Sequence, residues 1–324
     1  MKPARDLSLD YLRAIGLLLI ILAHVDPPRL LFHIRSFDVI LMVIVSTISY
    51  GCFSKKGKPY REYVVSRFKR LVFPTWQFII LSVMLFGVCD YLLGKPLHFT
   101  PKSIIVGLLT FSGIGYLWII RVFLYNAFLN PYIVKVRNLL PWKVYSLVIS
   151  GIMLSQVILI ISRGIGLEAI AEITIINMLA YSVVAALGFY FYVSSSNSQR
   201  IQLVTYSVLT FITFCKIGSF SPNAAKYPPQ FPYLIYGLTV SCILLYIFRI
   251  SKVERKNRFL IFVSSNSFWI YFWHVILLNT FSFYADYLTF YAVWPWYIKW
   301  INITACACML CLVQNQILKV GPKN

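Results

Sequence analysis

Long apolar segments recur from one end of this 324-residue chain to the other, and they restrict what it can fold into. Most of them are close to the ~20 residues that an α-helix needs to cross the hydrocarbon core of a membrane. Ten such segments can be recognised, at approximately residues 7–25, 37–53, 71–93, 104–134, 144–162, 173–193, 201–217, 231–250, 260–284 and 294–318. In lipid, each backbone polar group must be satisfied within its own helix. The sequence therefore predicts an all-α integral membrane protein, a bundle of about ten transmembrane helices.

The net charge of +20 would suggest nucleic-acid binding in a soluble protein, but this chain is 59% hydrophobic and only 12% charged. With the N-terminus in the cytoplasm, 20 of the 30 lysines and arginines fall in inner loops and flanks. Eight fall in outer ones: Arg29, Arg35, Lys95, Lys102, Arg163, Lys216, Lys226 and Lys299. This bias predicts an N-in, C-in topology. We expect the positive charge to orient the chain in the lipid bilayer, and we expect no nucleic-acid partner.

Residues 1–324 contain no Gly/Ser-rich linker, which predicts a single polytopic domain without an appended soluble domain. The first segment carries Asp10 and Arg13, so we do not expect a cleaved signal peptide. The seven cysteines lie in or beside apolar segments and are interpreted as packing residues. Cys306, Cys308 and Cys311 are close together, but no histidine or acid flanks them, and we predict no metal site.

Two polar residues in the first apolar segment, Arg13 and His24, are separated by ten residues. Eleven steps of about 100° bring the two side chains to nearly the same helix face, roughly 16 Å apart along the axis. A charged residue within a membrane helix is costly and is by default a candidate functional residue. This arrangement is expected of a site that holds a long anionic ligand at Arg13 and does chemistry at His24.

A basic motif, Arg67-Phe68-Lys69-Arg70, precedes the third apolar segment. Arg67 and Arg70 are three residues apart, so on a helix their guanidinium groups point the same way. Two such groups side by side suit a phosphate, which they can hold with paired hydrogen bonds. Anchoring at lipid headgroups on the inner side is the alternative, and the motif by itself leaves both interpretations open.

A polar stripe marks the ninth apolar segment, where Ser267, Tyr271 and His274 are spaced by four and three residues. In a membrane helix, such a stripe must face the bundle interior or a cavity. Hydrogen bonding between helices is an equally simple explanation, and for His274 alone a structural role is slightly favoured.

Further candidates lie in an outer loop and in the fourth apolar segment. Lys226 and Tyr227 stand before Pro228 and Pro229 in a stiff, proline-rich loop whose aromatic side chains could stack on a sugar ring or belong to an interfacial aromatic belt. In the fourth segment, Trp118 precedes Arg121, an arginine that could pair with an acid such as Glu62 or line the same cavity as Arg13.

Taken together and in this order, the motifs resemble the membrane acyltransferase-3 family. They are Arg-x10-His in the first segment, Arg-x-x-Arg before the third, Leu117-Trp118 in the fourth, Lys226-Tyr-Pro-Pro, and the late Ser267-Phe-x-Ile-Tyr-x-x-His274. The resemblance covers nearly the whole chain, and the first pair is its most specific element. Many members have a histidine before the Leu-Trp pair, where this chain reads Gly115-Tyr116.

The resemblance implies an O-acyltransferase that moves acetyl, or another short acyl group, from cytoplasmic acyl-CoA, with no tightly bound cofactor. The implied acceptor is a sugar hydroxyl of a cell-envelope polysaccharide or its lipid-linked precursor, and the implied location is the cytoplasmic membrane of a bacterium. By position, His24 is then the catalytic base and Arg13 lies along the substrate path. Arg67, Lys69 and Arg70 contact the CoA phosphates. The alternative is a transporter or flippase for an anionic or lipid-linked sugar, which intramembrane arginines also suit.

Overall fold

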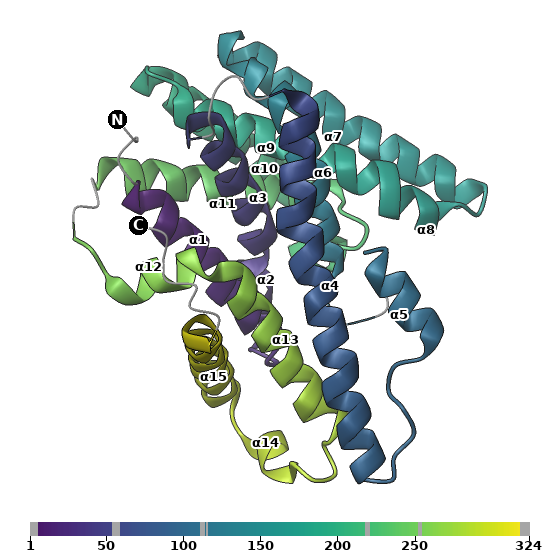
Figure 1. Ribbon diagram of the computed structural model, residues 1–324. Coiled ribbons are helices and arrows are strands. Elements are labelled where there is room, and N and C mark those ends of the chain that lie inside the picture. Colours follow the sequence, from purple (N-terminus) through teal and green to yellow (C-terminus); the bar gives the residue numbers. More distant parts are fainter. Residues whose placement is uncertain are drawn as a thin grey trace.

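The computed structural model of the protein describes residues 6–53, 59–110, 114, 116–217, 221–251 and 255–317. Helices make up all regular structure in these ranges, so the predicted all-α class is confirmed (Figure 1). The long helices are α1 (Leu7–Leu22), α3 (Asp38–Phe53), α4 (Tyr60–Leu92), α6 (Trp118–Ile133), α7 (Pro141–Gly164), α9 (Asn177–Val193), α10 (Asn197–Ile217), α11 (Phe231–Ile250), α13 (Ser267–Phe283) and α15 (Trp296–Ile317). Shorter elements between them are α2 (Arg29–Ile34), η1 (Arg35–Phe37), α5 (Pro101–Leu108), η2 (Val134–Asn138), α8 (Glu168–Ala171), the π-helical η3 (Glu172–Ile176), η4 (Pro222–Ala225), α12 (Arg258–Ser265) and α14 (Thr289–Val293).

Within the described residues, six helical stretches are long and apolar enough to cross a membrane, or seven if α12 and α13 count as one bent span. The six are Arg29–Phe53, Tyr60–Leu92, Pro141–Gly164, Glu168–Val193, Phe231–Ile250 and Trp296–Ile317. Helices α1 and α6 have only 16 residues each, and α10 is less apolar than the six. The predicted number of about ten spans is therefore not confirmed. The N-in, C-in orientation stays a prediction.

Two of the predicted segments are broken, which corrects the sequence analysis. The segment 104–134 is not one helix, because α5 ends at Leu108 and α6 begins at Trp118. Between them Thr110 has a left-handed backbone, with φ of 61°, which an α-helix cannot contain. The ninth segment divides at Asn266, where α12 and α13 meet with a bend of 81°. Irregular backbone at membrane depth must be enclosed by protein or line a cavity, so both breaks are candidate positions for a site.

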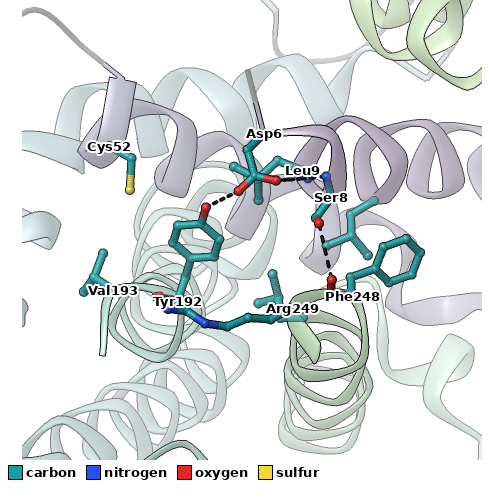
Figure 2. A pocket seen from close by; sticks show the side chains of 10 residues that line it. Asp6, Ser8, Leu9, Cys52, Tyr192, Val193, Phe248 and Arg249 are labelled. Carbon is teal, nitrogen blue, oxygen red and sulfur yellow. Dashed lines mark hydrogen bonds between the residues drawn. The ribbon is translucent and has the colours of Figure 1, made fainter. Parts of the chain in front are cut away.

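The bundle has two ends, which we name after one residue at each. At the Asp6 end, Asp6 accepts hydrogen bonds from the first backbone N–H groups of α1 and from the Tyr192 hydroxyl at the end of α9 (Figure 2). Ser8 Oγ donates to the carbonyl oxygen of Phe248, 3.3 Å away, near the end of α11. Helices α9 and α11 therefore run opposite to α1. The other end of the bundle, where α1 finishes, is the His24 end.

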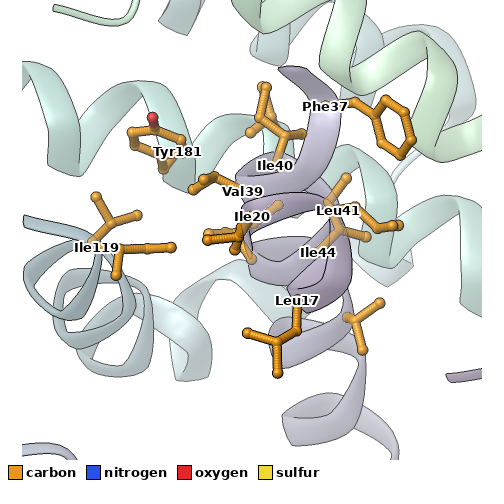
Figure 3. Packing of buried hydrophobic residues seen from close by; sticks show 14 of the residues in the cluster. Leu17, Ile20, Phe37, Val39, Ile40, Leu41, Ile44, Ile119 and Tyr181 are labelled. Atoms are coloured by element: carbon orange, nitrogen blue, oxygen red, sulfur yellow. The ribbon is translucent and has the colours of Figure 1, made fainter. Parts of the chain in front are cut away.

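Helix α3 lies at the centre of the bundle, packed against α9 and α11. Its residues Ile40 and Ile44 are fully buried in the main apolar core, together with Tyr181 of α9 (Figure 3). A Cβ atom on Gly188 of α9 would lie 2.5 Å from Cγ2 of Ile44, and one on Gly237 of α11 would lie 2.2 Å from Cδ1 of Ile40. Small residues let membrane helices approach this closely. The contacts fix the position of α3, whose first turn lies at the His24 end.

The substitution Gly188→Ala is expected to destabilise the protein by about 1–3 kcal/mol, because the added methyl group overpacks the contact with Ile44. Thermal unfolding of the purified protein in detergent measures the effect. The matched control is Gly87→Ala on α4, where a Cβ atom would have no neighbour within 4 Å. This control should leave stability unchanged or raise it, since alanine favours helix. Equal losses in both variants would contradict the assigned importance of the contact between α3 and α9.

Candidate active site

His24 lies just after the last turn of α1 and remains partly exposed. Its ring packs against the ring of Tyr116, with a centroid distance of 3.9 Å, and lies 5.6 Å from the ring of His274 on α13. Tyr271, one turn before His274, donates a 2.5 Å hydrogen bond to the carbonyl oxygen of Tyr116. The break between α5 and α6 therefore meets the end of α1 and the middle of α13 at His24.

The two histidines hold nitrogen atoms that no described residue satisfies. His274 is fully buried, and neither of its ring nitrogens has a hydrogen-bond partner among the described residues. The same holds for Nδ1 of His24. Buried polar groups in native proteins nearly always have partners, so the exceptions require an explanation. A site in which substrate atoms supply the missing partners is such an explanation.

A buried cluster of charges lies beside the histidines. Asp38, at the start of α3, is 1% exposed, and its two carboxylate oxygens are shared between two cations. Arg35 Nη1 donates to Oδ2 at 2.6 Å, and Lys226 Nζ donates to Oδ1 at 3.3 Å. Arg35 Nη2 also donates to the side-chain oxygen of Asn223 at 3.1 Å. The charge pattern of the sequence predicts Arg35 and Lys226 in outer loops and flanks. Asp38 shows only one signal in the sequence, which is that an acid at the start of an apolar segment is unusual.

Lys226 connects this cluster to the aromatic residues of the site. Its ammonium nitrogen lies 5.7 Å from the ring centroids of both Trp118 and Tyr227. Those two rings meet edge to face, with centroids 5.0 Å apart. Burial lowers the pKa of Lys226, while the carboxylate of Asp38 opposes that shift. The positive charge of Lys226 also acts on His24, so the histidines and the buried charges form one cluster.

Arg13 belongs to a second polar cluster, nearer the Asp6 end of α1. Its guanidinium group donates to Ser49 Oγ at 2.8 Å and to Ser264 Oγ at 3.3 Å, and Nη1 lies 3.6 Å from Oδ1 of Asp10. Ser264, the next-to-last residue of α12, in turn donates to Asp10 at 2.7 Å. The bend therefore lies between the two clusters. Ser264, before the bend, bonds Arg13 and Asp10, and Tyr271, after it, belongs to the His24 cluster.

The basic motif lies within α4 and not before its helix, because α4 begins at Tyr60. The Arg67 guanidinium lies over the ring of Tyr63, 5.2 Å from its centroid, whereas Lys69 and Arg70 are exposed. All three residues are near the Asp6 end.

A line of contacts leads from Arg67 towards Arg13. The ring of Tyr63 packs against Tyr50 of α3, with a centroid distance of 4.7 Å. Tyr50 follows Ser49, which bonds Arg13. Two groups that were predicted separately thus contact the same turn of α3, at side chains that point about 100° apart.

Two predicted residues lie apart from the His24 cluster. Ser267 opens α13, about 10 Å along the helix from His274. Arg121 is buried in α6 and donates to the carbonyl oxygen of Thr110 at 3.4 Å, and the charge of Glu172 in η3 acts on it. Glu62, the acid suggested by the sequence, is in the first turn of α4 at the Asp6 end. Gly115, quoted for the family motif, lies outside the described residues.

A cavity of about 530 Å³ opens at the Asp6 end, and none of the residues predicted for the site lines it (Figure 2). Apolar side chains of α1 and α11 form much of its wall, and the polar groups at its rim already have partners. Asp6 accepts from Tyr192, and Arg249 Nη1 donates to the carbonyl oxygen of Tyr192 at 2.6 Å. The candidate active site is therefore the cluster at His24 and not this cavity.

The fold and this cluster first define a class: a multi-pass, all-helical membrane protein with titratable side chains gathered where helices break. A family model described as an acyltransferase domain, that of the acyltransferase-3 family, matches residues 6–313. The chain belongs to this family and is a membrane acyltransferase, as the resemblance in its sequence indicated. No curated protein and no solved structure matches the chain.

Replacing Asp38 by Asn should destabilise the protein by about 3–5 kcal/mol, because Arg35 and Lys226 would remain buried without their counter-charge. Thermal unfolding in detergent checks this. The control is Asp286→Asn, since Asp286 is 87% exposed and pairs with Lys95 at the surface. That change should alter stability by about 1 kcal/mol or less. A small loss in both variants would show that the buried cluster does not hold the fold together.

Proposed function

We propose that the protein is an O-acyltransferase that moves acetyl, or another short acyl group, from cytoplasmic acyl-CoA to a sugar hydroxyl. The acceptor is a cell-envelope polysaccharide or its lipid-linked precursor, in the cytoplasmic membrane of a bacterium. One observation carries the proposal: a partly exposed histidine, His24, packs on Tyr116 beside His274, whose ring nitrogens have no partner among the described residues, and lies within electrostatic reach of the buried Lys226. Family membership supports the reaction type.

The donor enters at the Asp6 end in this proposal. The CoA phosphates bind Arg67 and Arg70, with Lys69 close by, through charge-assisted hydrogen bonds. The pantetheine arm passes Arg13 and follows α1 towards His24. The contacts of Arg67 with Tyr63 and of Tyr63 with Tyr50, which adjoins the Arg13 partner Ser49 in sequence, support this route.

The transfer step needs a base near the acceptor hydroxyl. Neutral His24 takes the hydroxyl proton as the oxygen attacks the thioester carbonyl carbon, and a tetrahedral intermediate forms. When the carbon–sulfur bond breaks, the acyl group stays on the acceptor and the thiolate of CoA receives the proton from His24. In this proposal the positive charge of Lys226, which acts on His24, also opposes the negative charge that develops on the carbonyl oxygen. A covalent acyl-histidine relay is the other route open to the same residue.

Transport of an anionic or lipid-linked sugar is the rival function. The discriminating measurement is made with purified protein and acetyl-CoA, by isothermal titration and by release of free CoA thiol. Binding or slow hydrolysis of acetyl-CoA supports the acyltransferase, whereas indifference to CoA supports transport. Mass spectrometry of envelope glycans, with and without the gene, then tests whether O-acetyl groups depend on this protein.

The substitution His24→Ala should abolish acyl transfer from acetyl-CoA while the protein remains folded in membranes, because the base is removed and its neighbours are kept. Transfer is measured with radiolabelled acetyl-CoA, and folding is measured by thermal unfolding in detergent. His33→Ala serves as the matched control, since His33 lies on α2 at the same end of the bundle. Full transfer activity in the His24 variant would overturn the proposed role.

Replacing Arg67 and Arg70 together by Ala should raise the KM for acyl-CoA about tenfold or more, because two charge-assisted hydrogen bonds to phosphate are lost. The KM for the acceptor should change by less than about twofold, since the acceptor binds elsewhere. The control variant replaces Lys135 and Lys143 by Ala, which also removes two positive charges. Both lysines are exposed near the Asp6 end. Equal effects on donor and acceptor would point to a folding defect instead.

A further inference from the structure

We propose that Asp26 and Tyr116 form the acceptor subsite, which binds an uncharged, hydroxyl-rich ring and presents one of its hydroxyl groups to His24. This inference rests on the proposed acyl transfer for the identity of the reaction. It adds the residues that hold the acceptor and the chemical class that they accept.

Asp26 occupies an unusual position directly beside the candidate base. It follows His24 by two residues, its backbone is left-handed with φ of 53°, and its side chain is exposed. Among the described residues, no hydrogen bond or ion pair involves its carboxylate. Nδ1 of His24 is also without a partner, so Asp26 does not orient the imidazole. A free carboxylate held in a sparsely populated conformation at a candidate site suggests a ligand contact.

Two tyrosines lie within electrostatic reach of this carboxylate. One face of the Tyr116 ring packs on His24, and the residue is 39% exposed. The backbone of Tyr116 is held by the hydroxyl of Tyr271. Tyr291 of α14 is stacked on Phe281, with ring centroids 3.8 Å apart and planes inclined by 7°. Burial and, after it, the carboxylate of Asp26 raise the pKa of both the Tyr116 and Tyr291 hydroxyls.

This combination of groups selects for a ring that bears hydroxyl groups. An ionised carboxylate only accepts hydrogen bonds, and sugar hydroxyl groups donate them. Aromatic rings that are fixed by packing offer flat apolar surfaces to the carbon–hydrogen face of a sugar ring. A carboxylate on the acceptor, next to the hydroxyl that reacts, would be repelled by Asp26. The subsite therefore favours neutral sugars over uronic acids at the position that is acylated.

The test measures binding separately from transfer. Wild-type protein in detergent is titrated with neutral methyl glycosides of hexoses and with the methyl glycoside of glucuronic acid, and binding is followed by saturation-transfer NMR. Asp26→Asn should weaken binding of the neutral glycosides about tenfold, since a hydrogen bond to a charged acceptor is lost. Binding of the uronic acid should weaken less or improve. Asp26→Gly, which accommodates the left-handed backbone, should behave as Asp26→Asn does.

Affinity for acetyl-CoA without acceptor, measured by isothermal titration, provides the second readout and should be retained in both Asp26 variants, because the CoA phosphates bind at Arg67 and Arg70 in the proposed function. A parallel loss of acetyl-CoA and glycoside binding overturns the subsite. Asp286→Asn, an exposed acid near the same end, is the control for charge alone and should not change glycoside binding. Unchanged glycoside binding in the Asp26 variants overturns the subsite. Glycoside binding that depends on Asp26, in a protein that ignores acetyl-CoA, would leave the subsite standing and overturn the proposed acyl transfer.

Discussion

The ion cluster at Asp38 is the interaction on which the rest of the site depends. A carboxylate in a low-dielectric interior is tolerated only when cations and hydrogen bonds compensate for the water that it has lost. Arg35 and Lys226 supply that compensation. Arg35 lies in η1, just before α3, and Lys226 lies in the loop before α11. The start of α3 is thereby tied to the loop before α11. The same link places Lys226 against Trp118 and within electrostatic reach of His24.

The two polar clusters along α1 differ in how well their groups are satisfied. Around Arg13, two serines accept hydrogen bonds from the guanidinium group and Asp10 forms an ion pair with it, so the arginine is held in one place. Around His24, three ring nitrogens of two histidines have no partner among the described residues. A fully bonded cluster rigidifies a structure, whereas one with free donors and acceptors can receive a ligand. This contrast assigns positioning to Arg13 and chemistry to His24 within the proposed mechanism.

The membrane class and the family could be predicted from the sequence, because apolar segments and motif spacing are local properties of the chain. The breaks could not, since nothing in the apolar pattern of 104–134 marks the left-handed Thr110, or in 260–284 the bend at Asn266. The predicted number of spans is not confirmed for a related reason: an apolar segment can end in a helix as short as α1. The link between Asp38 and Lys226 joins residues 188 positions apart, and no single sequence displays such a pairing.

The stretch of α1 between the two clusters bears on the choice between an enzyme and a transporter. Residues 16–23 read Gly-Leu-Leu-Leu-Ile-Ile-Leu-Ala, and a Cβ atom on Gly16 would lie 2.7 Å from the Met42 side chain of α3. A charged substrate that crossed this apolar stretch would lose its hydration without gaining a partner. A thioester on its pantetheine arm is uncharged, and its phosphates can stay behind at the arginines. The separation of Arg13 from His24 by an apolar stretch thus suits the passage of an acyl group and opposes the passage of a whole anionic sugar.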